Sequence, residues 1–213
     1  MNMAQFIANH WLDMLTTILG LAYIVLEYRA SIWMWVVGFF MEALGIVLYY
    51  QKGLYADCGM EFYYLAMTIY GFIAWKSPFR KASGEHVAEK AKPKEMPITH
   101  IKKSLIVPWA LITLAIWGAL YAFLVTCTDS RVPVADSFTT ALSIVGIIAL
   151  SHKYLEQWLI WIVVDAVTCE LYFYKDIPFK ASLYGLYVVI AVMGYFKWKR
   201  MMAQEPAREK SAS

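Results

Sequence analysis

Long apolar runs alternate with short polar gaps along this chain, and the runs have the length of membrane-spanning helices. About 20 apolar residues in a helix cross the ~30 Å of bilayer hydrocarbon, and fewer suffice where neighbouring helices cover the ends. The pattern predicts seven transmembrane helices, near residues 11–27, 32–50, 58–75, 104–126, 134–151, 155–173 and 180–197. We therefore expect an all-α membrane protein.

Two polar stretches lie outside these runs. Residues 76–103 are rich in Lys, Glu and Pro and have no hydrophobic face, which predicts a soluble linker between the third and fourth helices. Residues 199–213 are also polar, and we expect them to form a disordered C-terminal tail.

The chain contains an internal repeat. Residues 11–75 and 134–198 align without a gap at an offset of 123 positions. Apolar bundles resemble one another because Leu, Val and aromatic residues recur, but identical Lys, Asp, Trp and Gly at one offset favour a duplication. The identical pairs include Asp13 and Asp136, Thr16 and Thr139, Thr17 and Thr140, Trp35 and Trp158, Tyr49 and Tyr172, Lys52 and Lys175, Tyr64 and Tyr187, Gly71 and Gly194, Trp75 and Trp198, and Lys76 and Lys199.

This duplication predicts the domain organisation. The first repeat covers 11–75, the second covers 134–198, and an unmatched connector helix lies over 104–126. Because one connector returns the chain to its starting side, the two three-helix repeats are expected to be parallel, in a 3+1+3 arrangement.

Composition and charge support a membrane protein and give it an orientation. The chain is 61% hydrophobic and 16% charged, with a mean hydropathy of +0.51. If the 76–103 linker is cytoplasmic, fifteen Lys and Arg lie inside and four outside, which predicts an external N-terminus and a cytoplasmic C-terminus. Acidic residues interrupt the basic linker, so we expect no nucleic-acid partner.

Polar side chains are costly inside a bilayer, and here they form one stripe in each repeat. In the sixth predicted helix the spacing of 3, 4, 3 and 4 places five side chains on one face: Trp158, Trp161, Asp165, Thr168 and Tyr172. The second helix has, at the same offset, Trp35, Gly38, Glu42, Gly45 and Tyr49. One stripe is bulky and the other recessed, as expected if a flat molecule fits between the two repeats.

The stripes favour a small, flat, polar and cationic solute, because aromatic rings stack on planar groups and attract cations. Two simpler interpretations remain. Glu42 and Asp165 also fit buried acids satisfied by Tyr or Thr hydroxyls, and Gln157 either binds an amide or lies at the interface. Four tryptophans near the ends of the runs are interpreted as an aromatic belt: Trp33, Trp75, Trp109 and Trp198.

Several enzyme classes lack their motifs in this sequence. We find no P-loop, no Ser–His–acid set and no metal-ligand spacing, so we expect neither an enzyme nor a cofactor. A membrane enzyme acting on lipid headgroups, with Glu42 and Asp165 as an acid/base pair, is a weaker alternative because no nucleophile accompanies the two acids.

Seven helices in 3+1+3 order, with Trp158-Leu-Ile-Trp161 and the aligned acids, resemble the PnuC-type bacterial vitamin transporters over about residues 11–198. The resemblance implies a SWEET-like fold in the inner membrane and uptake of nicotinamide riboside, an NAD precursor, by facilitated diffusion. It also implies a homo-oligomer, a trimer, and a cytoplasmic kinase that traps the imported substrate. Another vitamin such as riboflavin or thiamine, a nucleoside, a sugar, or proton coupling remain alternatives.

Nicotinamide riboside fits the stripes chemically. Trp158 and Trp161 would stack on its pyridinium ring, Asp165 or Glu42 would accept its ribose hydroxyls or balance its charge, and Gln157 would bind its amide. The other expected substrate-binding residues are Thr168, Tyr172, Trp35, Tyr49, Tyr64 and Tyr187.

Overall fold

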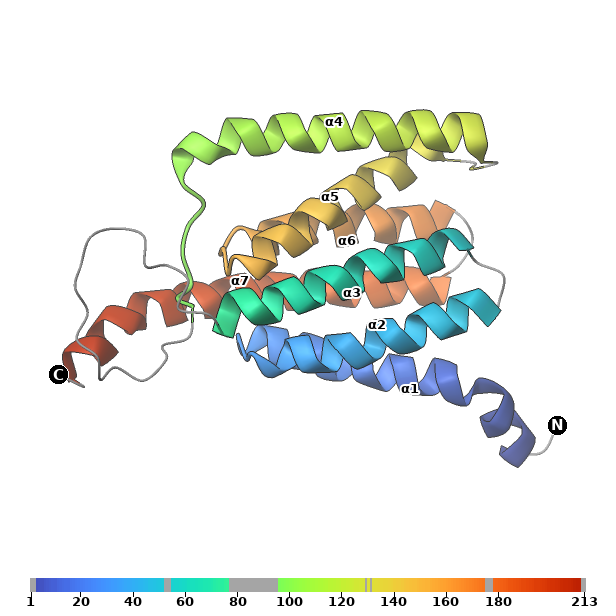
Figure 1. Ribbon diagram of the computed structural model, residues 1–213, viewed down its shortest axis with the longest axis horizontal. Helices are drawn as coiled ribbons and strands as arrows, with labels where there is room; N and C mark the ends of the chain where they lie inside the picture. The colour runs from blue at the N-terminus through green and yellow to red at the C-terminus, as the bar shows by residue number, and fades with distance from the viewer. Residues whose placement is uncertain are drawn as a thin grey trace. The chain divides into compact units, whose positions relative to one another are not determined.

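The computed structural model describes residues 3–51, 55–76, 96–128, 130, 132–174 and 178–211. Within these residues it contains seven α-helices and no named strand (Figure 1). The helices are α1 (Met3–Tyr28), α2 (Trp33–Gln51), α3 (Tyr55–Lys76), α4 (Lys103–Cys127), α5 (Pro133–Ser151), α6 (Gln157–Tyr174) and α7 (Pro178–Ser211). The seven predicted helices are confirmed.

The polar stretches behave differently from the apolar runs. Most of the predicted linker, 77–95, lies outside the described residues. At the other polar stretch, α7 continues as a helix to Ser211, through most of the segment for which we expected disorder. Its Lys, Arg, Glu, Gln and Ala residues are good helix formers, so polarity alone does not end the helix.

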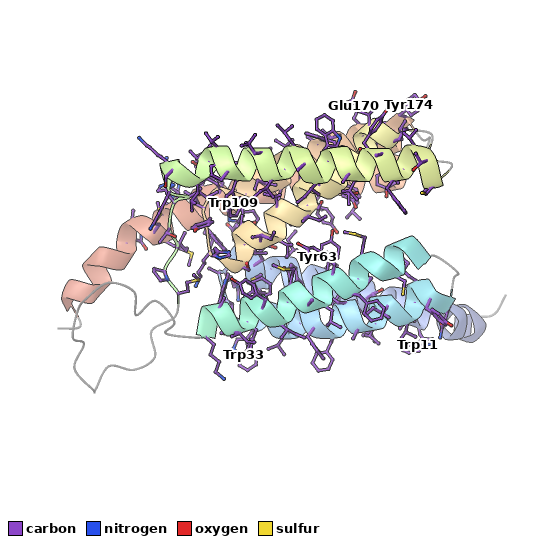
Figure 2. The ribbon with its side chains drawn as sticks, turned by 45° about the horizontal axis from the view of Figure 1, so that its top comes forward. Trp11, Trp33, Tyr63, Trp109, Glu170 and Tyr174 are labelled. Atoms are coloured by element: carbon purple, nitrogen blue, oxygen red, sulfur yellow. The ribbon has the colours of Figure 1, made fainter. Side chains whose placement is uncertain are left out.

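Four helical segments in the described chain are long and apolar enough to cross a membrane. They are Trp33–Gln51, Lys103–Cys127, Pro133–Ser151 and, within α7, Ala181–Gln204. The connector α4 buries none of its residues, and many of its apolar side chains are exposed. Exposed aromatic residues lie near opposite ends of the first three helices, at Trp11 and Trp33 (Figure 2). Aromatic rings at both membrane interfaces are typical of membrane-spanning bundles.

The helices form two units, residues 1–96 and residues 97–213. In unit 1, α2 packs against both α1 and α3. In unit 2 the helices pack in chain order, with α5 against α4 and α6, and α6 against α7 (Figure 1). The middle helix of each repeat, α2 or α6, therefore contacts both of its neighbours.

The internal repeat extends to the backbone of the corner that precedes each middle helix. Ala30 has a φ of 52° and Lys153 a φ of 55°, and these residues are 123 positions apart. In each corner the amide of the next residue donates to the carbonyl five residues earlier: Ser31 N–H to Leu26 O at 3.0 Å, and Tyr154 N–H to Ala149 O at 3.0 Å. Both corners are thus Schellman motifs, built with a left-handed residue other than glycine.

Each repeat also contains the same Trp–Gly–Trp packing. In unit 1, the Trp35 ring lies edge-on to Trp75, with ring centroids 5.5 Å apart and planes at 89°. A β-carbon on Gly71 would overlap the Trp35 indole, so the glycine lets that ring lie directly on the α3 backbone. This contact fixes how closely α2 approaches α3.

Unit 2 reproduces this packing. Trp158 and Trp198 have ring centroids 5.6 Å apart at 87°, and a β-carbon on Gly194 would lie 2.6 Å from the Trp158 ring. Trp75 and Trp198 are fully buried, so the prediction that they belong to an aromatic belt is wrong. Each instead packs with the tryptophan of the middle helix, because the glycine one turn earlier opens the helix surface.

Candidate functional site

The first two turns of α6 gather the polar groups predicted to bind substrate in unit 2. Gln157, Trp158, Trp161 and Asp165 follow one another at helical spacing on one face. Gln157 is 0% exposed, Trp158 2% and Asp165 8%, so three of the four are buried. The side chain of Gln157 is therefore enclosed by protein.

Several of these buried groups lack a hydrogen-bond partner among the described residues. Both amide atoms of Gln157, Nε2 and Oε1, are unpaired, and so are the Nε1 atoms of Trp158 and Trp161. A buried unpaired donor or acceptor costs about 1–3 kcal/mol, and nearly all such groups in proteins are paired. Trp35 Nε1 in unit 1 is unpaired as well, so the Gln157 amide and the Trp161 indole are the unpaired groups that distinguish α6 from α2, and they are free to bond a polar ligand.

The two indoles of Trp158-Leu-Ile-Trp161 have different surroundings. Trp158 is covered by Gly194 and Trp198, in the same way as Trp35 in unit 1. Trp161 lies against α5, where a β-carbon on Gly146 would be 3.4 Å from its ring, and it keeps part of its surface exposed. The Trp158 ring is part of the repeated framework, whereas the Trp161 ring has a free surface.

Further along α6, the site changes from unpaired donors to a carboxylate and phenols. Asp165 interacts electrostatically with the Tyr187 phenol on α7. Tyr172 packs on Tyr184, with centroids 5.3 Å apart, and Tyr184 on Tyr187 at 5.6 Å. Thr168 lies one turn beyond Asp165 and is half-buried. This end of the face can accept hydrogen bonds from hydroxyl groups and can balance a positive charge.

In unit 1, the corresponding acid is engaged within the unit. Glu42 is 7% exposed, and its side chain is hydrogen-bonded to that of Glu61 on α3. Tyr23 on α1 lies within electrostatic range of both Glu42 and Tyr64. Among the other predicted site residues of this unit, Trp35 is 1% exposed, while Tyr49 and Tyr64 are half-buried.

The recess expected along α2 is filled from within the unit, so that prediction is wrong. A β-carbon on Gly38 would meet the Tyr23 ring at 3.2 Å and Thr68 Oγ1 at 3.4 Å. A β-carbon on Gly45 would lie 2.9 Å from the Glu61 carboxyl group. The glycines make room for side chains of α1 and α3 and leave none for a ligand at these points.

At one helix–helix contact the two repeats place the large and the small residue on opposite helices, which we did not predict. The large residue comes from α1 in unit 1, where Tyr23 faces Gly38. It comes from α6 in unit 2, where Trp161 faces Gly146. These are the same two positions at the offset of 123, so aligning Tyr23 with Gly146 and Gly38 with Trp161 gives the signal that reveals the exchange.

Metal chemistry has no support in the described part of the chain, where no group of three or more His, Cys, Asp or Glu side chains is placed to hold an ion. The site on α6 therefore offers hydrogen bonds, an aromatic surface and one carboxylate. Such groups can complement a small polar molecule.

Comparison with known proteins identifies the class of molecule. The family model for nicotinamide mononucleotide transporters matches residues 10–200. The riboflavin/roseoflavin transporter RibM of Streptomyces davaonensis is 26% identical over 190 residues, covering 88% of this chain and 84% of RibM. The nicotinamide riboside transporter PnuC of Escherichia coli is 24% identical over 208 residues, with coverage of 88% and 84%.

A solved structure shares the fold. The crystal structure of the vitamin B3 transporter PnuC superposes with a TM-score of 0.68 at 21% identity, covering 93% of this chain and 85% of that one. The family and its neighbours are transporters and not enzymes, which agrees with the apolar helices. The chain is therefore a vitamin transporter and belongs to the nicotinamide mononucleotide transporter family.

Proposed function

We propose that this protein takes up nicotinamide riboside by facilitated diffusion, and that the first turns of α6 bind the substrate. The observation that carries the proposal is the fully buried and unpaired amide of Gln157 beside the indoles of Trp158 and Trp161. The carboxamide of nicotinamide has one acceptor and two donors, which complement those of the Gln157 side chain.

The pyridinium ring of this substrate is flat and positively charged. An indole surface attracts such a ring by ~1–2 kcal/mol when water is excluded, and Trp161 is the indole of this face with free surface. Asp165, one turn further along the same face, supplies the negative charge and acceptors for ribose hydroxyls. The same carboxylate repels a phosphate group, which favours the riboside over the mononucleotide.

Calorimetric titration of the purified protein tests this proposal. We expect nicotinamide riboside to bind more tightly than nicotinic acid riboside, nicotinamide mononucleotide or riboflavin. Gln157→Leu should weaken binding of nicotinamide riboside about tenfold, because it leaves the carboxamide without partners. Gln51→Leu, which changes an exposed glutamine at the end of α2, is the matched control and should bind normally. Equal affinity of Gln157→Leu and wild type would remove the proposed site.

Riboflavin is the second candidate substrate, because RibM transports riboflavin and roseoflavin and is as similar to this chain as the PnuC proteins are. Its isoalloxazine ring is also flat and carries an imide that Gln157 can bind, but it is neutral. A competition assay separates the two: riboflavin that displaces labelled nicotinamide riboside at equal or lower concentration would favour the flavin.

Transport without an energy source is the expected mode, with the two three-helix repeats as the moving parts of an alternating-access carrier. Uptake into vesicles should then equilibrate without ATP and should persist when the proton gradient is collapsed. Loss of uptake on adding an uncoupler would instead favour proton coupling.

The cellular arrangement follows from the same proposal. We place the N-terminus outside the bacterial inner membrane and the C-terminus in the cytoplasm, where a kinase traps the imported riboside by phosphorylation. We also propose a homotrimer. Labelling of a cysteine added at Ser213 by a membrane-impermeant reagent in whole cells would contradict this orientation, and a monomeric mass in native detergent solution would contradict the trimer.

A further inference from the structure

The segment that leads into α4 is bound to the corner between α5 and α6. Thr99 N–H donates to Lys153 O at 3.2 Å, and Leu155 N–H donates to Thr99 O at 2.9 Å. Ile98 beside Thr99 is 6% exposed, although the predicted linker around it lacked a hydrophobic face. The end of that linker is therefore part of the folded unit 2.

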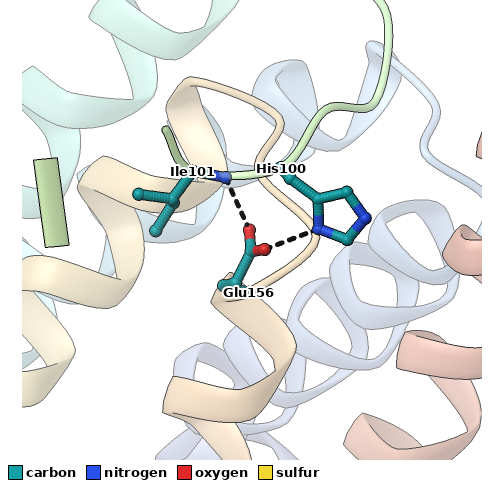
Figure 3. Close-up of polar contacts among 3 residues, drawn as sticks. All are labelled: His100, Ile101 and Glu156. Carbon is teal, nitrogen blue, oxygen red and sulfur yellow. Dashed lines mark hydrogen bonds and ion pairs between the residues drawn. The ribbon is translucent and has the colours of Figure 1, made fainter. Parts of the chain in front are cut away.

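Glu156 fastens this segment with both of its carboxylate oxygens (Figure 3). Its Oε1 lies 2.7 Å from Nδ1 of His100, and its Oε2 accepts from Ile101 N–H at 3.0 Å. Hydrogen bonds to a charged carboxylate are about twice as strong as neutral ones. We call Thr99, His100, Ile101 and Glu156 the α6 clasp.

The clasp is attached directly to the proposed substrate site. Glu156 is the residue before Gln157, whose buried amide is unpaired, and its own carbonyl accepts from Leu159 N–H at 3.0 Å and Ile160 N–H at 3.2 Å. A carboxylate anchored at two points therefore fixes the first turn of α6, on which Gln157 and Trp158 lie.

The corner does not need the clasp in order to form. The corner of unit 1 has the same Schellman hydrogen bonds, and its residue at the equivalent position, Ala30, is also left-handed. In place of Glu156 it has Trp33, which is 64% exposed and whose indole cannot accept two hydrogen bonds. In place of Gln157 it has Met34, which has no amide to orient. Among the described residues, the clasp and the amide thus occur together in unit 2 and are both absent from unit 1.

We propose that Glu156 is a positioning residue for substrate recognition: through His100 and Ile101 it holds the first turn of α6 so that the Gln157 amide meets the polar group of the vitamin ring. The inference deepens the proposed function and rests on it. The segment before α4, outside both three-helix repeats, then takes part in choosing the substrate.

The test compares amide discrimination in Glu156→Ala, Glu156→Gln, His100→Ala and the wild type. The measurement is the ratio of affinities for nicotinamide riboside and nicotinic acid riboside, which differ only where Gln157 is proposed to bind. Glu156→Ala should reduce this ratio about tenfold, which corresponds to 1.4 kcal/mol. Glu156→Gln keeps an acceptor for Ile101 N–H and should retain most of the ratio. Because His100 acts through Glu156, a protein carrying both Glu156→Ala and His100→Ala should lose no more of the ratio than Glu156→Ala alone.

Glu170→Ala is the matched control, because it removes an exposed glutamate from the far end of the same helix (Figure 2). It should leave the ratio unchanged. A lower melting temperature for Glu156→Ala with an unchanged ratio would show that the clasp only supports the fold, and it would overturn the proposal.

Hydrogen–deuterium exchange of the ligand-free protein separates this proposal from the proposed function. Faster exchange at amides 159–161 in Glu156→Ala, but not in Glu170→Ala, supports the clasp, and unchanged exchange overturns it whatever the substrate is. Failure of the wild type to bind nicotinamide riboside would overturn the proposed function alone; the clasp would then be tested with the same variants on riboflavin affinity.

Discussion

The two repeats share one framework but differ in how the polar groups of their middle helices are paired. Both have a tryptophan of the middle helix lying on a glycine of the third, at Gly71 and at Gly194. In unit 1 the buried acid is hydrogen-bonded to a second acid, and the glycines of α2 are covered by Tyr23 and Glu61. In unit 2 the amide of Gln157 and the indole of Trp161 are left unpaired.

This difference distinguishes two kinds of position in the duplicated sequence: those that are identical in the repeats and those that differ. Residues that are identical in the two repeats, such as the paired tryptophans and glycines, form the packing that both halves need. In the proposed site, the unpaired amide and the partly exposed indole come from positions at which the repeats differ: Gln157 against Met34, and Trp161 against Gly38. The repeat thus predicts the shared packing, and the positions that differ distinguish the proposed site from its counterpart in unit 1.

The largest effects on stability and binding should come from replacing each of the two tryptophans of α6 in turn. Trp158→Ala removes a buried ring and should destabilise the protein by about 3–5 kcal/mol, as large-to-small changes in packed cores do. Trp161→Ala should leave the melting temperature nearly unchanged but weaken nicotinamide riboside binding more than tenfold. Thermal unfolding in detergent and calorimetric binding measure the two effects. Equal losses of stability in both variants would contradict the division of roles.

The next largest loss of stability should come from adding a β-carbon at Gly71 or Gly194, the glycines of the shared packing. Gly194→Ala places the new atom 2.6 Å from the Trp158 ring, and Gly71→Ala overlaps Trp35, so each should cost about 1–3 kcal/mol through forced repacking. Gly118→Ala on α4 is the control, because its β-carbon meets no atom within 4 Å. Thermal unfolding of the three variants decides this. A Gly194→Ala protein as stable as Gly118→Ala would show that the framework is not rigid.

The two acids should respond differently to loss of charge. Asp165→Asn should weaken binding of cationic nicotinamide riboside about tenfold and that of neutral riboflavin very little, because only the cation needs the carboxylate. Glu42→Gln keeps a hydrogen bond to Glu61 and should alter neither affinity by more than about twofold. Binding titrations with both ligands check this prediction. Similar losses in both variants would mean that Glu42 also serves the substrate.

The smallest effect is expected from the exchanged glycine of α5. Gly146→Ala puts a β-carbon 3.3 Å from Ile160 and 3.4 Å from the Trp161 ring, so the ring must shift by a few tenths of an ångström. We expect binding to weaken about two- to fivefold without loss of stability, since small displacements of packed side chains cost up to about 1 kcal/mol. Gly185→Ala, with its nearest contact 3.7 Å away at Cys169, is the control. Unchanged affinity in Gly146→Ala would show that the position of the Trp161 ring does not affect substrate binding.

The apolar pattern by itself predicted the seven helices of the described residues, because a helix in lipid must satisfy its own backbone hydrogen bonds over a fixed length. It did not predict the full length of α1 and α7, which extend beyond their apolar runs. The offset of 123 likewise predicted the residue pairs whose packing recurs, since equal sequences in equal helices make equal contacts. The helical spacing of Gln157, Trp161 and Asp165 was also readable from the sequence.

Only the tertiary structure decided what surrounds these side chains. Spacing places Trp75 and Trp198 near the ends of apolar runs, but it does not reveal that a glycine one turn earlier draws them into the core. It places Gly38 and Gly45 on a recessed face, yet Tyr23 and Glu61 reach that face from other helices. It also gives no sign that His100 and Ile101 meet Glu156, 56 and 55 positions away. Periodicity records the neighbours along one helix, whereas burial and pairing depend on side chains that other helices bring to it.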